Sequence, residues 1–197
     1  MSRSEPVLVT VLRHGNVEGP SGVLRGSCDA ALSEEGMMQM NRILAKLESE
    51  SFDLVATSPL RRCRDFAADY AERIGLPLQV VPEFREIDFG LWEGLMPGGA
   101  ACPADEYRAF MDGRHAPPLG ESISQLRTRV SRGWAEWMAQ SGGAHRLLVT
   151  HAGVMRALLM ELFGFAPEQT FRIAFPEAAC LRISHLDGQT PFLLSLN

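Results

Sequence analysis

The stretch VLVTVLRHG, residues 7–15, runs from a short, β-branched apolar segment directly into an arginine and a histidine. An apolar run of this kind is typical of a strand that is buried on both faces of a parallel sheet. In an open α/β sheet, ligands collect beyond the carboxyl ends of the strands. Arg13 and His14 therefore stand where a binding site is expected.

Further apolar segments repeat this pattern, and helix-like segments lie between them. Strands are expected at 52–57, 76–81 and 146–150, with a closing hairpin of 180–186 and 191–197 that turns at Asp187 and Gly188. Helices are expected after an N-cap at Ser33, over 60–74, from about Ser122, and over 154–163. The alternation predicts a single α/β domain over residues 1–197, built as a three-layer α/β/α sandwich with a mostly parallel central sheet.

Residues 92–120 interrupt this alternation. Nine of these residues are Gly or Pro, and only 103–113 has the composition of a helix. Connections of this length inside a compact domain are usually lids or binding loops, although a disordered excursion is the plainer alternative. We therefore expect a lid-like insertion at about 92–120.

Charge and cysteine content exclude several classes of protein. The formal net charge of −5 argues against general binding of nucleic acid, which needs a basic face. The four cysteines stand far apart and form no C-x-x-C pair, so they suggest neither a zinc site nor a disulfide framework. The first apolar run is too short for a signal peptide, and no segment is long enough to span a membrane. We expect a cytoplasmic protein with no nucleic-acid or membrane partner.

Other ionisable side chains follow the remaining predicted strands. LLVTHAG (147–153) places His151 just past a strand, and SPLRR (58–62) places Arg61 and Arg62 in the first turn of a helix. A helix N-terminus and an arginine fork both bind anions. Taken singly, these features are ordinary, because such a histidine is usually a structural hydrogen-bonding group and such an arginine pair is usually solvated.

The combination with EFREIDFG (83–90), which offers Glu83, Glu86 and Asp88, suits phosphoryl transfer. In that chemistry arginines hold the phosphate oxygens, an imidazole attacks phosphorus, and a carboxylic acid protonates the leaving oxygen. Attack requires a neutral imidazole, and adjacent arginines favour that state because like charge lowers the histidine pKa.

The motifs LRHG, SPLRR, EIDFGLWEG and VTHAG, in this order and spacing, resemble the histidine phosphatase superfamily, also called phosphoglycerate mutase-like, over essentially the whole chain. The resemblance implies that His14 is the phosphorylated nucleophile and that Arg13, Arg62 and His151 complete the phosphate pocket. It also implies that Glu86 is the proton donor, and that the enzyme acts on a small phosphate monoester without a cofactor.

Within the superfamily, residues 14–36 and 117–130 are most similar to the bacterial α-ribazole phosphatases of cobalamin nucleotide-loop assembly. Many members have Glu or Gln, then Thr, and later Asn where this chain has Asn16, Val17 and Pro20. An accessory phosphate contact is therefore missing, or it is supplied by Arg25 or Ser27.

The remaining conspicuous residues leave other roles open. Trp92 either contacts the ligand or packs in the core, and the candidate apolar lining of the site is Trp92, Leu95, Met96, Tyr107, Phe110 and Met111. His115, in the lid, His145, in a Gly-rich turn, and His185, on a late strand, lack carboxylates at ligand spacing, so no metal is expected.

Three functions remain open: a phosphomonoesterase, either of α-ribazole type or of broad specificity, a mutase, and a non-catalytic module that binds a phosphorylated ligand. A mutase must hold its intermediate away from water, and a lid with only Arg108 and Arg114 is poorly equipped to hold a carboxylated sugar acid. A binding module would not need the complete catalytic set. We therefore expect a phosphatase. The sheet edge after Leu186 makes a homodimer a candidate assembly.

Overall fold

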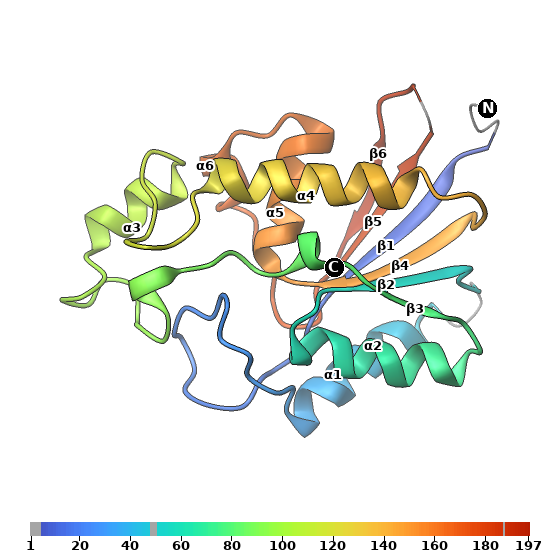
Figure 1. The fold of residues 1–197 in the computed structure, drawn as a ribbon, viewed down its shortest axis with the longest axis horizontal. Coiled ribbons are helices and arrows are strands. Elements are labelled where there is room, and N and C mark those ends of the chain that lie inside the picture. Colours follow the sequence, from blue (N-terminus) through green and yellow to red (C-terminus); the bar gives the residue numbers. More distant parts are fainter. Residues whose placement is uncertain (1–4, 48–50, 187) are drawn as a thin grey trace.

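The computed structural model describes residues 5–47, 51–186 and 188–197. Among these residues, six strands form one sheet in the order β3-β2-β4-β1-β5-β6 (Figure 1). Neighbours from β3 to β1 pair in parallel, whereas β5 and β6 add antiparallel strands at one edge. The strands are β1 (Val7–Arg13), β2 (Leu54–Thr57), β3 (Leu78–Val80), β4 (His145–Thr150), β5 (Cys180–His185) and β6 (Phe192–Leu196). The expected mostly parallel sheet is confirmed.

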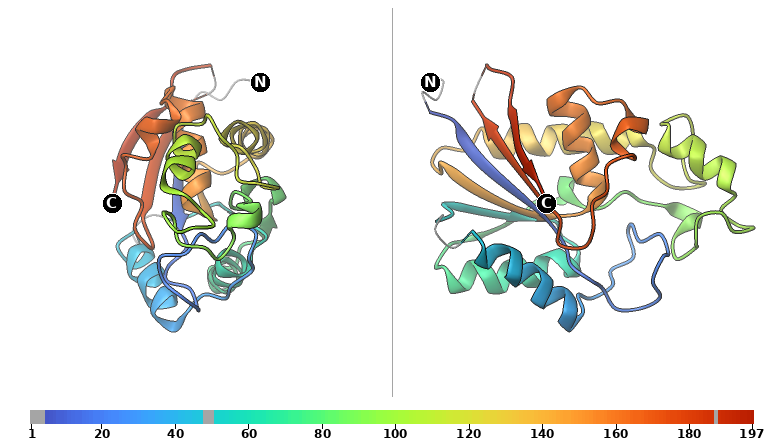
Figure 2. Two further views of the ribbon diagram at one scale, coloured as in Figure 1. Left: turned by 90° about the vertical axis from the view of Figure 1, so that its left-hand side faces the viewer. Right: turned by 180° about the vertical axis from the view of Figure 1, so that it is seen from behind.

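Helices cover both faces of this sheet, which confirms the three-layer arrangement (Figures 1 and 2). On one face, α1 (Glu34–Ala45) and α2 (Arg61–Arg73) pack against Leu147 and Val149 of β4. On the other face, α4 (Ile123–Met138) and α5 (Ala152–Phe163) pack against Val9 and Val11 of β1. The remaining helical elements are α3 (Ala104–Met111), α6 (Pro167–Thr170) and the 3-10 turns Pro82–Phe84 and Gly90–Trp92. Within the described ranges, no helix combines the length and hydropathy needed to cross a bilayer.

The structure differs from the expected elements at a few boundaries. His145 begins β4 instead of lying in a turn, because its amide donates to the Asp53 carboxylate at 2.9 Å and its Nε2 lies 3.1 Å from Thr10 Oγ1. The third strand is confined to Leu78–Val80, and α6 was not expected. The predicted hairpin of β5 and β6 is present, while Asp187 of its turn lies outside the described residues.

The insertion at 92–120 is packed, not an open loop. Trp92, Cys102 and Phe110 are buried, and the Trp92 and Phe110 rings meet edge to face with centroids 6.0 Å apart. At the base of the insertion, Leu91 donates to Pro118 O at 2.9 Å. The insertion therefore extends the core beyond the carboxyl ends of the parallel strands, and its role as a lid stays a prediction.

The loop after β1 crosses the first turn of α1 with the two backbones in direct contact. Ser33 caps this helix by accepting from Gly36 N at 3.1 Å, and Ser33 N donates to Asn16 O at 3.0 Å. A Cβ built on Gly36 would overlap the Asn16 carbonyl oxygen, and one built on Gly15 would overlap the Gly36 carbonyl oxygen. Only glycine at both positions allows the segment after His14 to take this path.

Replacing Gly36 by alanine is predicted to lower the free energy of unfolding by about 1–3 kcal/mol, the cost of forcing a methyl group into packed atoms. Helix propensity alone would change it in the opposite direction, because alanine is favoured over glycine within a helix by about 1 kcal/mol. Urea unfolding of Gly36→Ala measures the sign. Met38→Ala, at an exposed position of the same helix, is the control and should shift stability by less than about 0.5 kcal/mol. A more stable Gly36→Ala protein would contradict the close contact.

Candidate active site

Three adjacent parallel strands end at one place and bring their following residues together. His14 comes just after β1, Ser58 after β2 and His151 after β4. The His14 amide donates to Thr150 O at 2.9 Å, and the Ser58 amide donates to Val149 O at 3.0 Å, which extends the strand pairing into the site. The His14 and His151 rings lie edge to face with centroids 5.2 Å apart. The predicted juxtaposition of the two imidazoles is therefore present.

His14 is held in one tautomer. Its Nδ1 lies 2.8 Å from the carbonyl oxygen of Gly15, which can only accept, so Nδ1 carries the proton. Burial, together with the positive charges of Arg13 and Arg62, lowers the pKa of His14 well below its ordinary value. The imidazole is therefore neutral near pH 7, with its lone pair on Nε2.

His151 is held in the opposite way. Arg62 donates its Nε–H to His151 Nδ1 at 3.3 Å, and because a guanidinium is only a donor, Nδ1 is unprotonated. The proton therefore resides on Nε2, which lies 2.6 Å from Ser58 Oγ. Burial and the charge of Arg62 lower the pKa of His151 well below its ordinary value. The Nε2–H of His151 therefore donates to Ser58 Oγ, next to the His14 ring.

Arg62 is fully buried under the loop that follows β1. Its guanidinium donates to Cys28 O at 2.6 Å and to Gly26 O at 2.9 Å. Arg61, the next residue toward the N-terminus, pairs with Asp65 at 3.3 Å and is half exposed. The structure therefore buries Arg62 against His151 and leaves Arg61 half exposed, while phosphate binding by Arg62 stays a prediction.

Arg13 lies between the histidines and the segment that precedes β5. Its Nη1 donates to Phe175 O at 2.5 Å. Burial lowers the Arg13 pKa, while the carboxylates of Glu86 and Glu177 act in the opposite direction. The guanidinium lines the cavity beside His14.

The Glu86 side chain is buried against the first turn of α5. Its Oε1 accepts from the amide of Ile87 at 2.9 Å, and its Oε2 accepts from the amide of Gly153 at 3.2 Å. Glu83 instead pairs with Arg132 at 2.8 Å. Of the acidic residues in EFREIDFG, Glu86 therefore binds the helix turn that directly follows His151.

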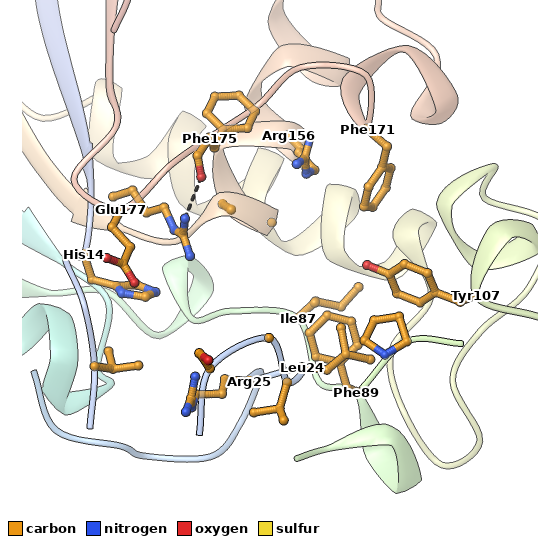
Figure 3. A pocket seen from close by; sticks show the side chains of 18 of the residues that line it. His14, Leu24, Arg25, Ile87, Phe89, Tyr107, Arg156, Phe171, Phe175 and Glu177 are labelled. Carbon is orange, nitrogen blue, oxygen red and sulfur yellow. Dashed lines mark hydrogen bonds between the residues drawn. The ribbon is translucent and has the colours of Figure 1, made fainter. Parts of the chain in front are cut away.

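A cavity of about 490 Å³ opens beside His14 (Figure 3). His14 and Glu177 lie at one end, whereas Phe89, Tyr107 and Phe171 lie toward the opposite end, which is mainly apolar and aromatic. The apolar residues of the cavity lining are Leu24, Ile87, Phe89, Pro97, Tyr107, Phe110, Ile123, Leu126 and Phe171. The cavity therefore joins a charged compartment to one that suits an apolar group.

Arg25, Ser27 and Trp92, the candidates for additional substrate contacts, lie in different places. Arg25 lines the cavity and donates to Pro20 O. Ser27 Oγ donates to Glu93 Oε1 at 3.2 Å, and Trp92 is 1% exposed against Tyr107 and Phe110. Among the described residues, the cavity lining includes neither Ser27 nor Trp92.

The expected apolar lining is present in part. Tyr107 and Phe110 line the cavity, whereas Leu95, Met96 and Met111 are not among the described residues that do so. Leu95 and Met111 pack instead against the hydrophobic core, and Met96 is exposed.

Sequence reasoning missed the wall formed by α5 and the segment before β5. Arg156 lies between the rings of Phe171 and Phe175, with its guanidinium 4.5 Å and 5.0 Å from their centroids. The sequence signal for this wall is Arg156 itself, the one arginine within the apolar run 154–163. Glu177 accepts from Asn16 Nδ2 at 2.9 Å, which gives a partner to one residue that departs from the family pattern.

The donor set around His14 suits an anion. Of the described residues, the cavity lining includes Arg13, His14 and Arg25 but not Arg62, Glu86 or His151. Guanidinium groups match phosphate oxygens. In the part of the chain that the structure describes, no cluster of three or more His, Cys, Asp or Glu side chains could hold a metal ion.

Comparisons with known proteins agree with this geometry. Residues 9–197 match the model of the histidine phosphatase superfamily (branch 1). The chain is 31% identical over 166 residues to adenosylcobalamin/alpha-ribazole phosphatase of Escherichia coli, covering 80% of each protein. It is 27% identical to phosphoserine phosphatase 1 of Hydrogenobacter thermophilus, covering 97% of this chain and 92% of that one. The structure of a mycobacterial glucosyl-3-phosphoglycerate phosphatase superposes with a TM-score of 0.81 at 27% identity, covering 91% and 90% of the chains.

Both site histidines are predicted to stay neutral at pH 6 in the folded protein, because their pKa values are lowered. In urea the same side chains should titrate near their reference pKa of about 6.5. The folded state then binds fewer protons below pH 6.5, so stability should fall as the pH drops below that value. Two-dimensional ¹H–¹⁵N NMR of the imidazoles measures this, with signals assigned from His14→Ala and His151→Ala. An imidazolium pattern at pH 6 would contradict the assigned tautomers.

Proposed function

Because the chain belongs to the histidine phosphatase superfamily, we propose that it is a phosphomonoesterase that works through a phosphohistidine at His14. The observation that carries the proposal is the His14 tautomer. Nδ1 donates to Gly15 O at 2.8 Å, and burial beside two arginines disfavours the imidazolium. A neutral, oriented imidazole with its lone pair on Nε2 is what attack on phosphorus requires.

In the first step, Nε2 of His14 forms a bond to phosphorus while the bond from phosphorus to the leaving oxygen breaks. Glu86 gives its proton to that oxygen, so the product leaves as a neutral alcohol. In the second step, water attacks phosphorus, Glu86 takes a proton from the water, and the N–P bond breaks. Inorganic phosphate is released, and His14 returns to its starting state.

Arg13, Arg62 and His151 are proposed to stabilise the transferring phosphoryl group. Its charge is spread over three equatorial oxygens, and positioned donors lower the barrier most when they act in a site that excludes water. The Nε2–H of His151 donates to Ser58 Oγ at 2.6 Å, so this role requires that it turn to a phosphate oxygen when substrate binds.

Two other functions predict different products. A mutase would return the phosphoryl group to its substrate, whereas a binding module would release neither phosphate nor isomer. Support for hydrolysis comes from the phosphatases among the relatives. No separate observation favours the binding module.

The finer proposal is that the substrate resembles α-ribazole 5′-phosphate. Its dimethylbenzimidazole base is bulky and apolar, and the cavity has an aromatic end formed in part by Phe89, Tyr107, Phe110 and Phe171 (Figure 3). Burying apolar area there gains about 25 cal/mol per Å² before ordering costs are subtracted. The relative with 31% identity supports the same class. A broad-specificity phosphatase is the alternative.

A covalent intermediate is the direct test of the chemistry. Mixing the enzyme with p-nitrophenyl phosphate and quenching at alkaline pH should leave a base-stable, acid-labile phosphate on the peptide that contains His14. The label should be absent from His14→Ala and present in His115→Ala, which changes a half-exposed histidine of the insertion. Label that persists in His14→Ala would refute the assignment of the nucleophile.

The substrate proposal predicts a graded preference. The kcat/KM for α-ribazole 5′-phosphate should exceed the values for phosphoserine, glucosyl-3-phosphoglycerate, 3-phosphoglycerate and glucose 6-phosphate, because remote binding energy orients the reacting phosphate. Tyr107→Ala should lower kcat/KM for α-ribazole 5′-phosphate more than for glycerol 2-phosphate, which does not reach the aromatic end. A flat profile would support broad specificity, and isomerised 3-phosphoglycerate without free phosphate would support a mutase.

A further inference from the structure

Arg129 lies on the buried face of α4, outside the phosphate site, and is directed at the segment that carries Glu86. Its Nη1 donates to Glu83 O at 2.6 Å and to Arg85 O at 2.8 Å, and its Nη2 donates to Glu86 O at 3.0 Å. The residue is 9% exposed. One guanidinium thus holds carbonyl oxygens along the four residues that end at Glu86.

The orientation of Arg129 is itself fixed by a paired carboxylate. Glu121 accepts from Arg129 Nε at 2.6 Å and from Nη2 at 2.7 Å, and both side chains are 10% exposed. A two-point pair of this kind sets the plane of the guanidinium as well as its position. Glu121 N also donates to Asp88 O at 2.8 Å, so the pair is tied to the chain on the far side of Glu86.

From this arrangement we infer that Arg129, oriented by Glu121, is the positioning residue for Glu86 in leaving-group protonation. The inference rests on the proposed function. The Glu86 carboxylate accepts from the amides of Ile87 and Gly153, but these contacts do not fix its backbone. Arg129 fixes the backbone of Glu86 relative to α4, and α4 packs on α5, the helix that contains Gly153.

A lysine cannot replace this arrangement. Its ammonium is a single point of charge and cannot match several carbonyls and a carboxylate in one plane. Misplacement of a catalytic group by about 1 Å can cost on the order of 10²-fold in rate. The loss should be confined to reactions that need the proton from Glu86.

The test compares two esters in each protein. p-Nitrophenyl phosphate has a leaving group that hardly needs a proton, whereas glycerol 2-phosphate has a basic alkoxide. The ratio of their kcat/KM values is independent of the fraction of protein that is folded. Glu86→Gln should lower the glycerol to nitrophenyl ratio by roughly 10²–10⁴-fold, and Arg129→Lys should lower it by at least about 10-fold.

A double variant and a matched control make the result specific. If Arg129 acts through Glu86, adding Arg129→Lys to Glu86→Gln should not lower the ratio further. Arg132→Lys, on the same helix, changes an exposed arginine that pairs with the Glu83 side chain and should leave the ratio unchanged. Should Arg129→Lys fail to fold, Glu121→Gln weakens the same pair and should lower the ratio in the same direction.

The outcomes separate this inference from the function on which it rests. A ratio that is unchanged in Glu86→Gln overturns the acid role of Glu86, and with it the positioning role. A ratio lowered in Glu86→Gln but unchanged in Arg129→Lys and Glu121→Gln overturns only the inference, because the clamp would then act on stability alone. Further loss of the ratio in the double variant also overturns it, because Arg129 would then act independently of Glu86.

Discussion

The parallel pairing of β1 with β4 is the constraint on which the site depends. It aligns Arg13 with Thr150, so His14 and His151 emerge from the same edge of the sheet although they are distant in sequence. A shift of one residue in this pairing would turn one of the two side chains to the opposite face and separate the imidazoles, because side chains alternate along a strand. The burial that lowers both histidine pKa values follows from the same position, beneath the loop after β1 and beside the first turn of α5.

Arginines that are buried or partly buried share one way of being accommodated. Arg13, Arg62, Arg129 and Arg156 each donate to main-chain carbonyls. A buried charge is costly unless hydrogen bonds compensate for it. Carbonyl dipoles supply that compensation without a full negative charge. Next to His14, the carboxylates of Glu86 and Glu177 also act on Arg13, so carbonyls and carboxylates together stabilise its charge.

Local pattern predicted most of the sheet and the phosphate side of the site. Apolar segments, caps such as Ser33 and the ionisable residues at strand ends are local signals that point to His14 and His151. The choice of Glu86 over Glu83 and Asp88 depends instead on the family resemblance. Residues whose surroundings depend on packing could not be placed in this way. Trp92 follows an acidic motif in sequence, yet the rings of the insertion bury it.

The residues that local pattern did not reveal depend on contacts between segments that are distant in sequence. Glu177 reaches the site because it accepts from Asn16 and Gln39, at 2.9 Å and 3.1 Å, far away along the chain. Arg129 shares the buried face of α4 with Leu126 and Val130. A charge on that apolar face is a signal visible in the sequence, but its partners are not. The Gly and Pro content of residues 92–120 likewise indicates an irregular insertion, but it does not show that Phe110 is buried there.

The division of the cavity into two ends has an evolutionary consequence. Strand ends supply His14 and its neighbours, whereas the 92–120 insertion and the segment before β5 supply much of the opposite wall. Mutations in those peripheral segments can change which substrates fit the cavity while the sheet and the residues at its strand ends stay the same. This separation fits the relatives, which are named for phosphatases of different metabolites.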